Sequence, residues 1–260
     1  MSTDPQTHIS NHLLATKSLP VSRAWVSQFL SKQRVATTPL SAVTQTALFR
    51  LLASDFTTSL SITAQSQVFP TDISDPAAKE RRVSGQVPVQ VLDIEDIGSS
   101  LWSQVEAIEK VERGEETRGR EIIRTVMRDE AGDVTAAGDG NNDNFTNASR
   151  GGNDNTAGAR NTASTSASGG PHRLVLQDAK GTRVVAIELK PVGEIGIGKL
   201  SIGAKMVLRN ATVARGILLL EPDNVSVLGG KIEAMDREWK TGRKARLLAR
   251  LEEQGAGQAT

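Results

Sequence analysis

The chain contains no cysteine and no tyrosine, and its 31 basic residues are nearly balanced by 30 acidic ones. Without cysteine it has no disulfide framework and no metal site built on thiolates. A formal net charge of +1 gives no overall signal for binding a polyanion. No apolar run approaches the ~20 residues that a membrane-spanning helix needs. The N-terminal residues have neither a basic start nor an apolar core, so they predict no signal peptide, and we expect an intracellular, soluble protein.

Composition divides the chain into two structured parts and two polar stretches. Residues 132–170 are dominated by Gly, Asn, Ser, Thr and Asp, and Val134 and Phe145 are their only large apolar residues. This stretch buries too little surface to offset the entropy lost on ordering, so it predicts disorder. Residues 63–86 are polar, contain two prolines and a charged run, and are interpreted as a linker.

Residues 1–62 have the apolar spacing of a small three-helix bundle. In the segment SLPVSRAWVSQFLSKQ, Ser18 and Pro20 favour a helix start. Every fourth position there is apolar, at Val21, Trp25 and Phe29. A second helix is predicted after Thr38 and Pro39, and a shorter one before both, around Ile9, Leu13 and Leu14. The Trp and Phe side chains are expected to form the core.

Residues 87–230 change to the pattern of strands. In PVQVLDIEDI the apolar positions alternate and then slip in phase at Leu92, which predicts a bulge in a bent strand. A helix capped by Ser99 or Ser100 is expected next, with Leu101, Val105 and Ile108 on its apolar face. Four further strand-like runs follow, RLVLQD, TRVVAIEL, AKMVLRNATV and GILLLEPDNVSVL, with turns at 178–181 and 215–216. Together they predict an α+β protein, in which a five-stranded OB-type barrel over 87–230 precedes a C-terminal helix at 231–254.

The stretch GEIGIGKLSIG, residues 193–203, contains most of a phosphate-binding loop, GxxxxGK followed by Ser or Thr. Leu200 stands where that hydroxyl would bind magnesium, and a strand pattern follows instead of the helix that holds the phosphate. The stretch therefore predicts a connection between the third and fourth barrel strands, with Leu200 and Ile202 tucked under the barrel. No nucleotide is expected there.

Other signals for catalysis or metal binding are weak. His8 and His12 have the spacing of a zinc pair on a helix, but no third ligand is evident in the sequence. We expect two polar surface residues. No nucleophile motif is present, so the sequence predicts no enzyme, no catalytic residue, no cofactor and no metal.

A barrel of this type often binds nucleic acid, but aromatic rings for stacking bases are scarce. Residues 172–230 contain no aromatic residue, although single-strand binders stack bases on such rings. Basic residues gather in the C-terminal helix, at Arg237, Lys240, Arg243, Lys244 and Arg246, where acidic residues dilute them. Two interpretations stay open, a solvated helix face and a weak contact with the DNA backbone.

The run GILLLEPDNVSVLGGKIEAM, residues 216–235, resembles the signature of the RecQ-mediated genome instability protein 1 family. The similarity includes the aliphatic triplet, the Asn-Val pair and the Val-Leu-Gly-Gly block. Three upstream runs resemble the family's first barrel strands and its N-terminal helices: LVLQDAKGTRVVAIELKPV, VLDIEDIGSSLWSQVEAI and AWVSQFL. The residues 132–170 match nothing in that pattern.

The resemblance implies a non-catalytic scaffold in genome maintenance. Family members bind topoisomerase III and act with a Bloom-type RecQ helicase to dissolve double Holliday junctions, so we expect a nuclear protein that is monomeric before the complex assembles. The resemblance also implies that an insertion after the first barrel strand, here residues 112–171, contacts the topoisomerase. The expected contact is an apolar motif at helical spacing, Ile122, Ile123, Val126 and Met127. The alternative is an OB-fold module that binds single-stranded or branched DNA directly.

Overall fold

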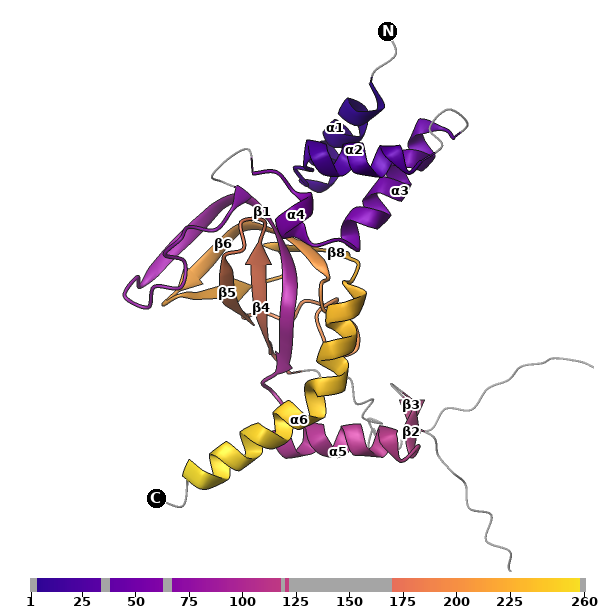
Figure 1. Ribbon diagram of the computed structural model, residues 1–260. Coiled ribbons are helices and arrows are strands. Elements are labelled where there is room, and N and C mark those ends of the chain that lie inside the picture. The colour runs from indigo at the N-terminus through magenta and orange to yellow at the C-terminus, as the bar shows by residue number, and fades with distance from the viewer. Residues whose placement is uncertain (1–3, 34–37, 63–66, 118–119, 122–169, 258–260) are drawn as a thin grey trace, which may run out of the picture.

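The computed structural model describes residues 4–33, 38–62, 67–117, 120–121 and 170–257. A group of N-terminal helices lies at one end of a β-barrel, and a single helix lies at the opposite end (Figure 1). The long C-terminal helix runs beside the barrel and reaches that single helix (Figure 1). This arrangement confirms the predicted α+β fold of N-terminal helices, OB-type barrel and C-terminal helix. None of the described helices is long and apolar enough to cross a membrane.

The N-terminal part contains four helices, α1 (Pro5–Lys17), α2 (Arg23–Ser31), α3 (Leu40–Leu52) and α4 (Phe56–Ser59). Their inward faces share one core, formed by Ile9, Leu13, Val26, Phe29, Val43, Ala47, Leu51 and Phe56. The first three helices are the predicted ones, but α1 is as long as α3 instead of shorter. Helix α4 has no counterpart in the prediction, because four residues are too few to show a helical period.

Three details of this helical part differ from the prediction. Ser18 does not start a helix, since it ends α1 in a left-handed conformation with φ of 59°. Helix α2 begins only after Ser22, because Val21 pairs with Leu60 in an antiparallel bridge and so has extended backbone. Phe49, predicted to be core, is 72% exposed.

The barrel closes through the strand order β1-β4-β5-β7-β6 and the additional pairing of β6 with β1. Its strands are β1 (Glu80–Asp96), β4 (His172–Asp178), β5 (Arg183–Glu188), β6 (Lys205–Ala214), β7 (Ile217–Leu220) and β8 (Val225–Gly229). The last predicted run is split, since β7 pairs with the second half of β6 and β8 with its first half. The barrel core contains aliphatic side chains from all of these strands.

Strand β1 begins earlier than the sequence predicted. Residues 80–86, assigned to a linker, pair with the end of β6, and the expected bulge appears as a register shift between Val91 and Asp93. Residues 67–79 also belong to the barrel, because Phe69 and Ile73 are buried in its core. This half of the strand was not predicted because residues 79–82 are charged. Few of its positions are buried, so the sequence lacks the alternation of apolar residues that is typical of a strand.

The glycine-rich stretch connects β5 with β6, as predicted. Leu200 and Ile202 are buried in the barrel core, and the stretch leads into strand β6 and not into a helix. The Lys199 ammonium donates to the carbonyl of Gly193 at 3.4 Å, inside the same loop. The loop therefore closes one end of the barrel with its own apolar side chains.

A buried polar cluster, here termed the helix–barrel joint, connects α4 to the barrel. Its members are Asp55, Phe56, Gln90, Gln177 and Lys205. The Gln90 amide oxygen accepts from the Phe56 backbone N–H at 3.0 Å and from Lys205 Nζ at 3.1 Å. Its amide nitrogen donates to Asp55 at 2.9 Å and to Gln177 at 3.0 Å. Burial lowers the pKa of Lys205 to about 8, although the nearby Asp55 carboxylate acts in the opposite direction.

Candidate protein-interaction surface at the root of the insertion

The insertion begins beyond helix α5 (Leu101–Glu112), and a side-chain turn at the end of β1 fixes the start of that helix. Asp96 Oδ1 accepts from the backbone N–H groups of Gly98 at 2.8 Å and Ser99 at 3.1 Å. The second oxygen of Asp96 accepts from the Ser99 hydroxyl at 2.7 Å. Ser100, one of the two predicted caps, accepts from the Ser103 N–H. These bonds set the direction in which α5 leaves the barrel.

The chain returns from the insertion directly beside this turn. The Ile97 N–H donates to the carbonyl of Pro171 at 3.0 Å. A Cβ atom on Gly98 would lie 2.5 Å from the Cα of Gly170, so the two backbones touch at a point where no side chain fits. The segment made up of α5 and the insertion therefore leaves the barrel and returns to it at one narrow place.

Below this contact, a buried histidine–glutamate pair secures the first residue of β4. His172 Nδ1 lies 2.6 Å from Glu188 Oε2, and both side chains are 3% exposed. The same oxygen accepts from the His172 backbone N–H, and the other oxygen accepts from the Val192 N–H at 2.9 Å. Glu188 thereby ties the start of β4 to the end of β5 and to the loop that follows.

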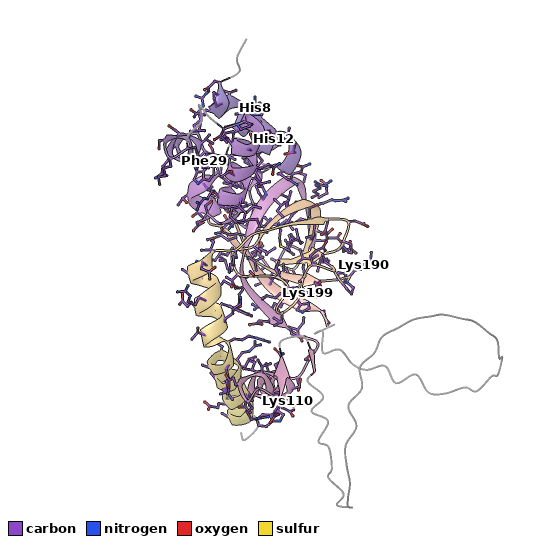
Figure 2. The ribbon with its side chains drawn as sticks, turned by 90° about the vertical axis from the view of Figure 1, so that its right-hand side faces the viewer. His8, His12, Phe29, Lys110, Lys190 and Lys199 are labelled. Atoms are coloured by element: carbon purple, nitrogen blue, oxygen red, sulfur yellow. The ribbon has the colours of Figure 1, made fainter. Side chains whose placement is uncertain are left out.

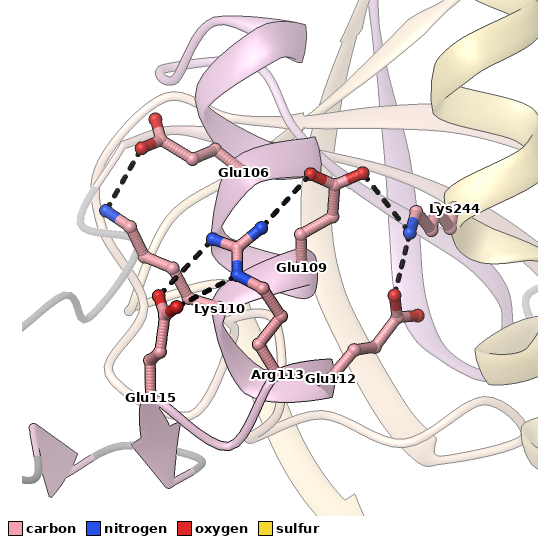
Figure 3. Close-up of polar contacts among 7 residues, drawn as sticks. All are labelled: Glu106, Glu109, Lys110, Glu112, Arg113, Glu115 and Lys244. Atoms are coloured by element: carbon pink, nitrogen blue, oxygen red, sulfur yellow. Dashed lines mark hydrogen bonds and ion pairs between the residues drawn. The ribbon is translucent and has the colours of Figure 1, made fainter.

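Helix α5 is fastened to helix α6 (Glu233–Gly257) by ion pairs (Figure 3). Lys244 of α6 lies 3.3 Å from Glu109 and 2.7 Å from Glu112, and hydrogen bonding to Glu112 raises its pKa. Further pairs follow the exposed side of α5, between Lys110 and Glu106, and from Arg113 to Glu109 and Glu115. Exposed pairs contribute less than about 1 kcal/mol each, so the lysine that bridges two helices matters most here.

Large apolar side chains are exposed at the start of α5. Trp102 is 66% exposed, and Ile97, which lies just before the helix, is 45% exposed. Large exposed aromatic residues are characteristic of protein-interaction surfaces, and Trp is frequent among the residues that dominate binding energy. We term Ile97 and Trp102 the root surface. Val111, which is 40% exposed, lies near the far end of α5 on the opposite side of the helix from Trp102 and does not belong to this surface.

The position of Trp102 in the sequence already indicates that its side chain is exposed. The predicted apolar face of α5 consists of Leu101, Val105 and Ile108, and Trp102 lies outside that stripe. A tryptophan on the polar side of an amphipathic helix indicates a surface that binds something. In the structure Val105 is buried and Leu101 and Ile108 are partly buried, which confirms the predicted face.

The predicted topoisomerase-contact residues Ile122, Ile123, Val126 and Met127 lie outside the described residues. Immediately before them, strands β2 (Glu116–Thr117) and β3 (Arg120–Glu121) form a two-residue ladder. Residues 120 and 121 pair as a strand, and the helical spacing of the four residues after them stays a prediction.

The five predicted DNA-contact residues do not form one patch of free positive charge. Lys240 lies 2.5 Å from Asp236, and Lys244 contacts the two glutamates of α5. Arg237 has 76% of its side chain exposed and lies 3.9 Å from Glu233. Arg243 and Arg246 each lie 5.7 Å from the ring centroid of Trp239. Carboxylates thus lie beside Arg237, Lys240 and Lys244, and the two remaining arginines flank an indole.

The histidine pair lies far from the root of the insertion. His8 and His12 stack on α1 with ring centroids 6.2 Å apart, at the opposite end of the molecule from Lys110 on α5 (Figure 2). Among the described residues, no group of three His, Cys, Asp or Glu side chains is placed to hold a metal ion.

Two family descriptions match the chain in sequence. "RMI1, N-terminal OB-fold domain" matches residues 69–243, which is more than half of the chain, and "RMI1, N-terminal helical domain" matches residues 13–59. The chain belongs to the RecQ-mediated genome instability protein 1 family. This confirms the resemblance found in the sequence, and the matched residues correspond to the barrel and to the N-terminal helices.

Two relatives with the name "RecQ-mediated genome instability protein 1" show how far the similarity extends. The Schizosaccharomyces pombe protein is 29% identical over 158 residues, which are 61% of this chain and 61% of the relative. The Xenopus laevis protein is 42% identical over 80 residues, which are 30% of this chain and 14% of the relative. The chain thus spans less than two thirds of either relative. The shared name connects the family with genome stability.

Proposed function

We propose that the protein is a non-catalytic scaffold subunit that binds topoisomerase III and supports dissolution of double Holliday junctions together with a RecQ-type helicase in the nucleus. Membership of the family carries the proposal, because both of its N-terminal regions are matched in order along the chain. The root surface and the inserted segment beyond it are the proposed contacts with the topoisomerase.

The architecture favours a protein as the main binding partner, and not the bases of a nucleic acid. The barrel strands contain no aromatic residue, so they offer no ring on which a base could stack. The basic residues of α6 are largely engaged with acidic neighbours or with Trp239. By contrast, the exposed Trp102 and Ile97 lie where the chain leaves for the insertion and where it returns.

A pull-down of purified topoisomerase III by the full 260-residue chain tests the proposal. The wild-type chain should retain the enzyme, and a variant with Ile122, Ile123, Val126 and Met127 all changed to Ser should retain much less. A matched variant, with Val134 and Phe145 changed to Ser, removes apolar side chains from the same insertion outside the motif and should bind as wild type does. Melting temperatures of all three proteins should agree if these side chains contact the partner, because the barrel core described in the structure is formed by other residues.

Two results would contradict this assignment. If the wild-type chain does not retain topoisomerase III, the scaffold function is wrong. If the chain instead shifts single-stranded or branched DNA at micromolar concentration in a gel, and the five basic residues of α6 are required for the shift, the direct DNA-binding alternative is correct.

A further inference from the structure

A hollow of about 280 Å³ lies between the end of β1, the start of α5 and the middle of α6. Its apolar lining comes from three elements and includes Ile94, Leu101, Trp239 and Leu247. This volume is large enough to take one aromatic or long aliphatic side chain. Ile97 and Trp102 of the root surface do not line the hollow, although their chain neighbours Asp96 and Leu101 do.

Trp239 forms one wall of the hollow and is held rigidly. Its indole N–H donates to Asp93 Oδ1 at 2.6 Å, which fixes α6 against β1. Arg246 folds back along the helix, and its guanidinium donates to the Trp239 carbonyl at 2.8 Å. Gly242 makes room for that path, because a Cβ atom there would lie 2.7 Å from Arg246 Nη1.

The carboxylates that line the hollow have partners within the protein, but the Arg246 guanidinium has no ion pair among the described residues. Its carboxylates already have internal partners, since Asp93 accepts from Trp239, Asp96 holds the turn before α5, and Glu95 pairs with Arg173 and Arg250. Arg246 differs from them. In the part of the chain that the structure describes, no carboxylate lies within ion-pairing distance of its guanidinium, whose described contacts are a carbonyl and the Trp239 ring.

We propose that this hollow binds a short acidic peptide segment of a partner protein. One large apolar side chain of the segment fills the hollow, and a neighbouring aspartate or glutamate pairs with Arg246 at its rim. A guanidinium over an indole is preorganised for a carboxylate, because the stacking holds its plane in place. The site does not depend on topoisomerase III as the partner.

A peptide suits this site better than nucleic acid does. Three carboxylates and three arginines line the hollow, so its charges nearly balance and give no net attraction for a chain of phosphates. A peptide brings only one or two negative charges beside an apolar group. The lining is apolar and formed from several elements, which favours a side chain as the buried group. Two of the arginines predicted to contact DNA, Arg243 and Arg246, therefore belong to the rim of a peptide site.

Fluorescence anisotropy with defined probes tests the assignment on the full chain. The probes are labelled 12-residue peptides with a central Phe, Leu or Trp and with Asp or Glu three and four positions away on both sides. Matched peptides carry Lys in place of the acidic residues. We expect at least one acidic peptide to bind saturably with a Kd below 100 μM, and its Lys counterpart to bind at least tenfold more weakly.

Three variants localise the binding. Arg246→Gln removes the unpaired charge, and Ala249→Trp partly fills the hollow from an exposed position of α6. Each should weaken the acidic peptide at least tenfold. Arg237→Gln removes an exposed arginine of the same helix that does not line the hollow, and it should leave the Kd within twofold. Circular dichroism should show the same helix content for all four proteins.

Three outcomes would contradict the proposal of a peptide site. No saturable binding of any acidic peptide up to 1 mM rules it out. Equal weakening by Arg237→Gln and Arg246→Gln shows attraction to the whole helix instead of a built site. Displacement of the peptide by a 20-nucleotide single strand, with the strand bound more tightly, assigns the arginines to nucleic acid.

Discussion

The ammonium nitrogen of Lys205 lies 3.1 Å from the amide oxygen of Gln90, and neither side chain has any surface exposed to solvent. The same ammonium lies 4.8 Å from the centroid of the Phe56 ring. A cation is therefore buried at the helix–barrel joint, where it connects α4 with strands β1 and β6. Burying an amine at this place makes the free energy of unfolding depend on pH.

Stability should rise with pH between about 8 and 10.5 because of Lys205. Its pKa is about 8 in the folded chain and 10.5 in the absence of burial, so the unfolded chain binds more protons in this range. The free energy of unfolding then increases with pH, by on the order of 3 kcal/mol in total from this group. The change Lys205→Met should remove the increase. Denaturant melts at intervals from pH 7 to 10 measure it.

The composition of the chain removes two other sources of pH dependence from this experiment. The chain has no cysteine and no tyrosine, so no thiol or phenol titrates in the same range. Paired lysines such as Lys190 and Lys244 have raised pKa values, so the stability they provide is lost only above pH 10.5. If wild type and Lys205→Met show parallel pH profiles, the amine is not desolvated in solution and the joint is open to water.

The two glycines at the end of β8, Gly229 and Gly230, should tolerate alanine very differently. Gly230 has a φ of +81°, and a Cβ atom there would lie 2.4 Å from the carbonyl oxygen of Leu52 in α3. Gly229 has a similar φ of +79°, but nothing lies within 4 Å of its Cβ position. We expect Gly229→Ala to cost about 1 kcal/mol from backbone strain alone. Gly230→Ala should cost about 2–4 kcal/mol, because it also pushes α3 away from the barrel.

Thermal melts of both glycine variants, compared with wild type, measure that difference. Equal melting temperatures for the two would show that α3 moves away without cost, so that its contact with residue 230 does not stabilise the fold. A larger loss for Gly229→Ala would mean that strain, and not space, dominates at this connection.

Charge reversal at Lys244 should loosen the contact between α5 and α6. Lys244→Glu would place a third carboxylate beside Glu109 and Glu112, so two attractive pairs become two repulsive ones. We therefore expect a larger loss of stability than from the matched change at Arg237. Arg237→Glu on the same helix meets only Glu233 at 3.9 Å and should cost less than about 0.5 kcal/mol. Urea melts at low salt compare the two variants, and 1 M NaCl should reduce the difference between them. Equal losses would mean that these ion pairs do not fasten α5.

The barrel was predictable because its signals are local. The phase slip at Leu92, the hairpin turn that begins at Asp178 and the turn at Arg215 each lie within a few residues, and each appears where it was expected. The burial of Lys205 was not predictable, because it depends on Gln90 and Phe56, more than a hundred residues away in the chain. Long-range pairing also explains the missed first half of β1, whose charged residues become a strand only through β6.

In the candidate sites too, features that depend on neighbouring residues were predictable, and features that depend on distant residues were not. The basic residues of α6 were visible in sequence, but their acidic neighbours across the α5–α6 contact were not, since Lys244 and Glu112 are far apart in the chain. The hollow under Arg246 needs β1, α5 and α6 to meet, so no sequence pattern could indicate it. Trp102 was different, because the sequence alone shows that it lies outside the apolar stripe of α5.

Trp102→Ser should weaken binding of topoisomerase III at least tenfold without lowering the melting temperature. The side chain is 66% exposed, so its removal leaves the core intact, while a buried tryptophan at an interface commonly accounts for about 2 kcal/mol or more of binding energy. Phe49→Ser is the matched control, because Phe49 is a similarly exposed aromatic residue, 72% exposed, on α3 among the helices at the other end of the barrel. Titration calorimetry with purified enzyme measures both affinities.

The pair of variants separates the possible contact surfaces. Loss in Trp102→Ser alone assigns the topoisomerase to the α5 end of the barrel, where the insertion starts and returns. Loss in Phe49→Ser alone would move the contact to the N-terminal helices and contradict the root surface. If neither change alters the affinity while the fourfold serine variant of the insertion abolishes it, the inserted segment binds by itself and α5 serves only to hold its ends together.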